Sequence, residues 1–246
     1  MPLLDAQQKV KRAKKFLQEL KDEINEFHAT KPYRVIEEKI DEEFSALKLR
    51  FKKIFPREIK AILGDLTSNL RASLDLMVCE LAKNNGRGIS GIYFPTAESK
   101  QRFDSNDVQE IIRNLSDEAK AFINGLEPYK GGKHQLLWVL NKLEIVNKHR
   151  ALINIGSNST QIRIDRMNMP VVTGLEIVPP RWDAEDESLV LLKMKEGTVV
   201  EYSITVNFFT GFRDIELIEG VEIVSVCTKL IEEVEDILNC AANNLF

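Results

Sequence analysis

Cysteine is scarce in this sequence: its 246 residues include only Cys79, Cys227 and Cys240, and none of them forms a CxxC pair. An odd number of cysteines without paired spacing argues against a disulfide framework and against a cysteine-based zinc site. No run approaches the roughly 18 consecutive apolar residues of a membrane-spanning helix, and residues 1–16 are too charged for a signal peptide. We therefore expect reduced thiols, no membrane segment and a cytoplasmic location.

Motifs of the common catalytic and cofactor sites are missing as well. The sequence contains no HExxH, no phosphate-binding glycine loop and no GxSxG, so it predicts neither a metal site nor a cofactor. The formal net charge of -4 gives no general attraction to phosphate. Nucleic acid stays open as a partner, but the net charge does not support it, and binding would need a local basic patch.

Apolar residues at three- and four-residue steps predict most of the helices. The clearest stripe begins after Pro56, and Asn and Gly residues at 84–88 are expected to end that helix. Two shorter helices each begin with a serine that can act as an N-cap, Ser105 and Ser116. The predicted helices span about 5–28, 57–83, 105–114, 116–124, 133–150 and 221–243.

Alternation of apolar and charged residues predicts strands at 33–40 and 44–55, which Asp41-Glu42-Glu43 would connect as a hairpin. Because this connection has neither Gly nor Asn, a continuous helix is the alternative. Later in the chain, short runs rich in Ile and Val predict a mainly antiparallel sheet. These runs are 151–155, 161–166, 175–178, 189–195 and 199–209.

The order of these elements predicts an α+β fold, in which a bundle of four or more helices packs with a mainly antiparallel sheet and a C-terminal helix closes the chain. A helix-rich part, 1–150, precedes a strand-rich part, 151–215, and the last helix, 221–243. No Pro-, Gly- or Ser-rich linker divides these parts. We expect residues 1–246 to form one compact unit.

Polar residues share an apolar face on the helix at 133–150, where Asn147 and Arg150 fall beside Leu136, Val139, Leu140, Leu143 and Val146. A buried polar group without a partner costs about 1 to 3 kcal/mol, so both need partners or a cavity. On the long helix, Arg71 and Asp75 lie four residues apart and can pair, and Asp75 could also receive Arg150. Arg71, Asp75, Asn147 and Arg150 therefore form either a structural network or a binding site.

His149 is the candidate catalytic residue, because a histidine can act as a general acid or base near neutral pH. Lys148 beside it could stabilise negative charge. The helical wheel turns both side chains away from the apolar face and puts His149 near Lys142 and Ile145. The alternative interpretation is a structural or surface histidine.

Several short segments within about 56–155 form a recognisable set: Leu63-Gly64-Asp65, Asn69-Leu70-Arg71-Ala72-Ser73-Leu74-Asp75, Phe94-Pro95, Glu127-Pro128-Tyr129 and Asn147-Lys148-His149-Arg150. Together they resemble an uncharacterised group of bacterial and phage proteins. The pattern of that group is an LRxxLD helix followed by a helix that ends in KHR, and the resemblance implies no known activity.

A second resemblance concerns Lys142 and His149, which six residues separate. This arrangement is similar to the Arg, spacer and His of HEPN proteins, helical bundles that often act as metal-independent ribonucleases and as dimers, although here lysine replaces the arginine. One hypothesis is thus a ribonuclease in which His149 is the base and Lys148, Arg150 or Lys142 stabilises the developing charge.

The other hypothesis is a non-catalytic intracellular binding or interaction protein of bacterial or phage origin. In this hypothesis Arg71, Asp75, Asn147 and Arg150 organise the helical core or a ligand pocket, and a protein or a second copy of the chain could be the partner. We favour it because of the net charge and the lysine in place of arginine. Whether the protein is an enzyme stays open at this point.

Overall fold

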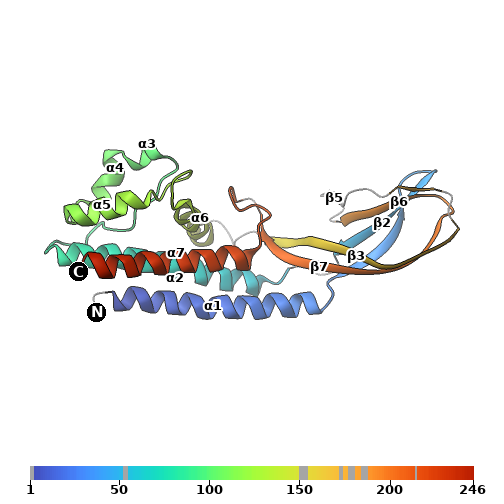
Figure 1. The fold of residues 1–246 in the computed structure, drawn as a ribbon, viewed down its shortest axis with the longest axis horizontal. Coiled ribbons are helices and arrows are strands. Elements are labelled where there is room, and N and C mark those ends of the chain that lie inside the picture. Colours follow the sequence, from blue (N-terminus) through green and yellow to red (C-terminus); the bar gives the residue numbers. More distant parts are fainter. Residues whose placement is uncertain are drawn as a thin grey trace. The chain divides into compact units, whose positions relative to one another are not determined.

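The computed structural model describes residues 3–51, 55–149, 155–171, 174–176, 181–183, 188–213 and 215–246. Within these residues, seven α-helices and several antiparallel strand pairs confirm the predicted α+β class, and a helix ends the chain (Figure 1). The contacts of the chain divide it into two units. The prediction of one compact body depends on how these units are placed and stays a prediction.

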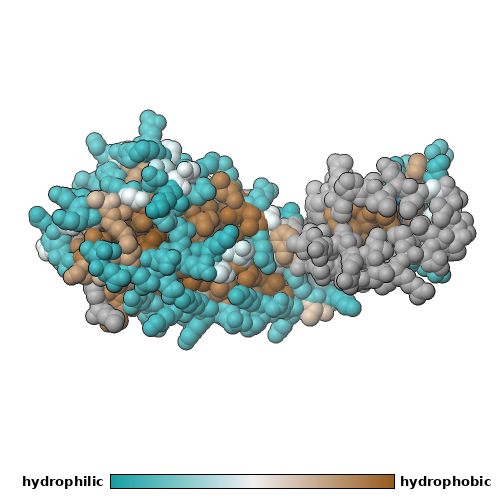
Figure 2. Space-filling model, viewed as in Figure 1, coloured by the Kyte–Doolittle hydropathy of each residue, from teal (hydrophilic) through white to brown (hydrophobic). Residues whose placement is uncertain are grey.

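The helical unit comprises Met1–Glu23, Arg57–Gly156 and Thr210–Phe246. No helix in the described ranges is both long and apolar enough to cross a membrane. The surface visible in Figure 2 is mainly hydrophilic on this unit, with smaller apolar areas. Its elements are α1 (Leu4–Ala29, which continues beyond the unit), α2 (Arg57–Asn84), α3 (Lys100–Phe103), α4 (Asn106–Gln109), the 3-10 helix η1 (Glu110–Ile112), α5 (Asp117–Leu126), α6 (Gln135–His149) and α7 (Ile223–Asn244).

Helix α2 lies at the centre of this unit, because it contacts both α6 and α7. Its predicted apolar stripe is fully buried, including Leu63, Leu66, Leu70 and Leu74. Each such side chain contributes roughly 1.5 to 3 kcal/mol through burial. The helix ends at Asn84, within the predicted range 84–88, and Gly86 follows it with a φ of 66°, the left-handed conformation that closes a helix.

Serine residues mark the starts of the short helices, with one correction. Ser116 caps α5 by accepting a hydrogen bond from the Ala119 amide at 3.2 Å. Ser105 does occupy the N-cap position of α4, but its side chain makes no capping hydrogen bond. Its hydroxyl instead donates to the carbonyl oxygen of Arg102 at 2.7 Å, and the predicted helix 105–114 is a short α4 followed by η1.

The strand-rich unit comprises Ile24–Pro56 and Ser157–Phe209. Strands β1 (Tyr33–Lys39) and β2 (Phe44–Phe51) pair as the predicted antiparallel hairpin, so the continuous-helix alternative is wrong. A carboxylate replaces the usual turn glycine: Asp41 Oδ1 accepts from the amides of Glu43 and Phe44, both at 2.8 Å. This local side-chain bonding explains a tight connection without Gly or Asn.

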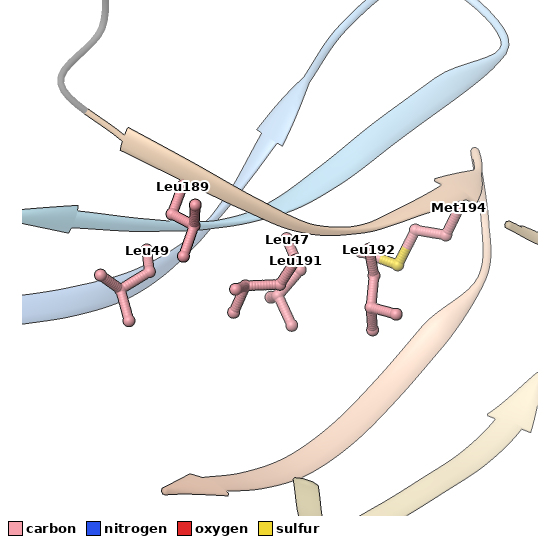
Figure 3. Close-up of a cluster of buried hydrophobic side chains, with 6 residues drawn as sticks. All are labelled: Leu47, Leu49, Leu189, Leu191, Leu192 and Met194. Atoms are coloured by element: carbon pink, nitrogen blue, oxygen red, sulfur yellow. The ribbon is translucent and has the colours of Figure 1, made fainter. Parts of the chain in front are cut away.

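Strand β6 (Ser188–Lys195) pairs with β2, with β4 (Leu175–Glu176) and with β5 (Arg181–Asp183). The register shifts opposite Leu47 and Lys48, so the consecutive residues Leu191 and Leu192 are both buried. This bulge lets six apolar side chains from two strands form one cluster, and Figure 3 shows them projecting from the same side of the sheet. The cluster consists of Leu47, Leu49, Leu189, Leu191, Leu192 and Met194.

Two long strands, β3 (Ile155–Val171) and β7 (Val199–Phe212), form a second sheet. The predicted strand 161–166 lies within β3, and 199–209 lies within β7. Strand β5 was not predicted. Most of the predicted strand 151–155, and the end of 175–178, lie outside the described residues.

Candidate functional site

Helix α2 carries a stripe of polar side chains at four-residue spacing, Arg71, Asp75 and Cys79, which share one face of the helix. Arg71 Nη2 lies 3.1 Å from Asp75 Oδ1, so the two residues form the ion pair that their spacing predicts. Only 9% of the Arg71 side chain is exposed, compared with 35% for Asp75. The guanidinium is therefore the buried member of the pair.

This stripe binds the backbone of a loop. Arg71 Nη2 donates to the carbonyl oxygen of Phe94 at 2.5 Å, and Asp75 Oδ1 accepts from the Phe94 amide at 2.9 Å. One turn further along, the Cys79 thiol donates to the carbonyl oxygen of Ile92 at 3.7 Å. We call Arg71, Asp75 and Cys79 the loop anchor, because they satisfy backbone groups that no helix or strand satisfies.

One donor of the loop anchor is unused. Arg71 Nη1 is buried and has no hydrogen-bond partner among the described residues. Leaving a buried donor unsatisfied costs about 1 to 3 kcal/mol, and more when the group is charged. The ion pair with Asp75 and the bond to the Phe94 carbonyl oxygen must therefore offset this cost.

Arg71 also lines a pocket of about 410 Å³ on the helical unit, which we call the Arg71 pocket. Its walls come from α2, α3, α4, η1, α6 and the loop that the anchor holds. The polar lining residues are Arg71, Thr96, Glu98, Arg102, Asp107, Asn141 and Lys142. The apolar and aromatic ones are Tyr93, Ala97, Val108, Ile111, Trp138 and Ile145.

The more exposed charges of the Arg71 pocket are paired with one another. Lys142 on α6 forms an ion pair with Glu98, and Arg102 Nη1 on α3 lies 3.0 Å from Asp107 Oδ2 on α4. Lys142 Nζ also lies 5.2 Å from the centre of the buried Trp138 ring, which is within the range of a cation–π contact. These four charges are thus balanced within the protein.

Two further polar side chains of the pocket are available. Thr96 and Asn141 are half-buried, and neither makes a side-chain hydrogen bond within the part of the chain that the structure describes. They offer an amide and a hydroxyl to the pocket. The lining as a whole is mixed, because polar and charged side chains are about as numerous in it as apolar and aromatic ones.

Asn147 contacts α2 at a different place. Its side chain lies against Gly64, and its Nδ2 is 3.5 Å from Ser68 Oγ, which in turn donates to the buried carboxylate of Glu144 at 2.6 Å. Gly64 precedes Arg71 by seven residues, so the two positions are about 10 Å apart along the helix. The half-buried Asn147 faces α2, as the helical wheel predicts.

The structure therefore brings together only part of the predicted binding set. Arg71 and Asp75 form one group with Phe94, whereas Asn147 belongs to the polar contact at Ser68. Arg150 lies outside the described residues.

The two candidate catalytic residues, Lys148 and His149, lie at the end of α6, and for both only the helical backbone is described. Their predicted role stays a prediction. Across the described ranges, no group of three or more His, Cys, Asp or Glu side chains could hold a metal ion.

Sequence reasoning missed the Arg71 pocket itself. Thr96 and Asn141 carry no signal of their own, because a single polar residue in a loop or on a helix is common. The four-residue spacing of Arg71, Asp75 and Cys79 was a usable signal, since a polar stripe on a helix this buried needs partners beyond the helix. The chain matches no family model, no curated protein and no solved structure, so its function must be inferred from this site.

Proposed function

We propose that this protein is a non-catalytic binding protein that takes a small organic molecule in the Arg71 pocket. The observation that carries the proposal is the pair of half-buried side chains Thr96 and Asn141 on the pocket wall, neither of which makes a side-chain hydrogen bond in the described part of the protein. A ligand that hydrogen-bonds to them gains roughly 0.5 to 1.5 kcal/mol per bond.

The size and walls of the pocket support the proposal. A volume of about 410 Å³ lies within the roughly 300 to 1,000 Å³ that small-molecule sites occupy. The loop anchor supports it too, because it fixes the backbone of the loop that forms one wall. Because this wall is already fixed before binding, less conformational entropy is lost when a ligand binds.

A thermal-shift screen of the full chain with a library of neutral, acidic and basic small molecules tests the proposal. We expect some compounds to raise the Tm of the wild type and to lose this effect with Ile145→Trp. Ile145 lines the pocket and is 38% exposed, so a larger side chain there fills the pocket without opening the core. Leu4→Trp, at a 57% exposed residue of α1, is the matched control and should respond like the wild type. No stabilising compound, or equal responses of both variants, contradicts the proposal.

The ribonuclease hypothesis predicts that the protein cleaves RNA, whereas the proposed function predicts that it does not. Lys142, which replaces the arginine of the HEPN motif, is engaged by Glu98 and is therefore less available to a phosphate. We expect no cleavage when the protein is incubated with total RNA and a chelator. Cleavage that is lost in His149→Ala would instead establish a metal-independent ribonuclease and overturn the non-catalytic proposal.

A further inference from the structure

The charged residues that line the Arg71 pocket are all paired within the protein. Each of the three cations of the lining has a carboxylate partner: Arg71 with Asp75 at 3.1 Å, Arg102 with Asp107 at 3.0 Å, and Lys142 with Glu98. Within the described pocket wall, no charge is left over to balance that of a ligand. A charged ligand would lose part of its hydration there without gaining a partner of opposite charge, so the pairing favours an uncharged ligand.

The polar groups that remain for a ligand are the uncharged side chains of Thr96 and Asn141. Neither makes a side-chain hydrogen bond among the described residues, and neither belongs to the fully buried polar atoms that lack a partner. The polar atoms of both side chains are therefore accessible to a ligand. The ion pair between Lys142 and Glu98 joins the two segments that carry them, because Lys142 follows Asn141 and Glu98 lies two residues after Thr96.

Two large apolar side chains of the lining are open to solvent, Tyr93 with 46% of its surface exposed and Ile145 with 38%. Ile145 lies four residues after Asn141, so the two share one face of α6. Tyr93 precedes Phe94, whose amide and carbonyl oxygen are both held by the loop anchor. A ligand body that covers these side chains removes apolar surface from water, and a molecule that is only a polar group would leave this surface unused.

A carboxamide complements the Asn141 side chain more completely than a charged group does. The Asn141 amide presents an acceptor oxygen beside its N–H donors. A ligand carboxamide presents the same groups in reverse order, so the two amides can form a pair of hydrogen bonds. A carboxylate only accepts hydrogen bonds and an amidinium only donates them, so each would satisfy one half of Asn141. The Thr96 hydroxyl both donates and accepts, and it can bind what remains of the ligand amide.

We infer that the ligand is an uncharged molecule with a carboxamide or lactam group on an apolar body. The amide group pairs with Asn141, and the body packs against Tyr93 and Ile145. The inference rests on the proposed binding function of the same pocket and adds the chemical class of the ligand.

Three probes of nearly the same planar shape test the chemical class on the full chain: benzamide, which is neutral, benzoate, which is anionic, and benzamidinium, which is cationic. Their dissociation constants are measured by NMR titration. We expect benzamide to bind at least about tenfold more tightly than either charged probe, which corresponds to about 1.4 kcal/mol. Equal or tighter binding of benzoate or benzamidinium overturns the inference, and so does the absence of benzamide binding.

The variant Asn141→Asp locates the ligand amide. It replaces the amide of this residue by a carboxylate of almost the same size, which accepts hydrogen bonds and donates none. We expect benzamide to bind about tenfold more weakly to this variant and benzamidinium to become the tightest of the three probes. Asn243→Asp is the matched control, because Asn243 is an exposed asparagine of α7 outside the lining, and it should keep the preference for benzamide. An unchanged preference in Asn141→Asp overturns the inference.

Failure of this inference can be distinguished from failure of the proposed function. If a charged probe binds more tightly than benzamide and Ile145→Trp abolishes its binding, the pocket binds another class of ligand; the inference then fails and the proposed function stands. If Ile145→Trp weakens the binding of no compound, both the inference and the proposed function fail.

Discussion

Replacing Gly64 by alanine tests the contact between α2 and α6 most directly. A Cβ atom at this position would lie 2.3 Å from Asn147 Oδ1 and 2.7 Å from both Cγ and Nδ2 of the same side chain. All three distances are shorter than atoms without a covalent bond tolerate. Asn147 would have to turn away and give up its contact with Ser68.

Two opposing effects decide how much Gly64→Ala changes the free energy of unfolding. Alanine is more favourable than glycine within a helix by about 1 kcal/mol. Overpacking a well-packed site costs about 1 to 3 kcal/mol. We therefore expect Gly64→Ala to lower the free energy of unfolding by up to about 2 kcal/mol in the wild type. In an Asn147→Ala background the clash is gone. There, Gly64→Ala should raise the free energy of unfolding by up to about 1 kcal/mol.

The assay is urea unfolding followed by the helical circular dichroism signal, for the two single variants and the double variant. Gly125→Ala is the matched control, because it adds a Cβ to an exposed helical glycine with no atom within 4 Å. It should be equally favourable in both backgrounds. If Gly64→Ala has the same effect with and without the Asn147 side chain, that side chain does not pack against Gly64 and the reasoning is refuted.

Two further predictions concern the loop anchor and the thiols. Asp75→Ala removes the acceptor of the Phe94 amide, so hydrogen exchange at this amide should become at least several-fold faster; an unchanged rate would show that the loop does not depend on the anchor. Burial raises the pKa of the Cys227 thiol to about 12, and burial together with the nearby Asp75 carboxylate raises the pKa of Cys79. The thiolate is the reactive form, and a raised pKa keeps the thiol protonated. Iodoacetamide at pH 8 should therefore label the exposed Cys240 first, Cys79 more slowly and Cys227 only on unfolding. Peptide mapping measures the labelling of each cysteine. Rapid labelling of Cys227 in the native protein would contradict its burial.

The elements that the sequence predicts well are those in which local pattern and tertiary burial agree. The apolar stripe of α2 could be read because every turn of this helix faces a neighbour. The hairpin of β1 and β2 follows from the alternation of apolar and charged residues. Its turn depends instead on the Asp41 carboxylate, which accepts hydrogen bonds from two backbone amides. Such side-chain bonding leaves little trace in composition.

Irregular pairing explains part of what the sequence missed. Leu191 and Leu192 both face the apolar cluster because a bulge interrupts the alternation of β6. A strict two-residue period assigns one of the two to the opposite face, so a bulge cannot be read from the pattern alone.

For the candidate site, too, the local part could be predicted and the tertiary part could not. The pairing of Arg71 with Asp75 follows from their spacing on one helix, which is a local property. Their partner Phe94 lies on a loop about twenty residues later, and neither spacing nor composition connects it to α2. The sequence thus indicated that these side chains need partners, and only the fold identified them.

The loop anchor also restricts how the length of α2 can vary. Its three side chains, Arg71, Asp75 and Cys79, reach one loop only while they stay in angular register. Inserting or deleting a single residue between them would rotate one part of the helix by about 100° relative to the other. The segment should tolerate exchanges of side chains far better than a change in the number of residues, which makes its length a stricter requirement than its composition.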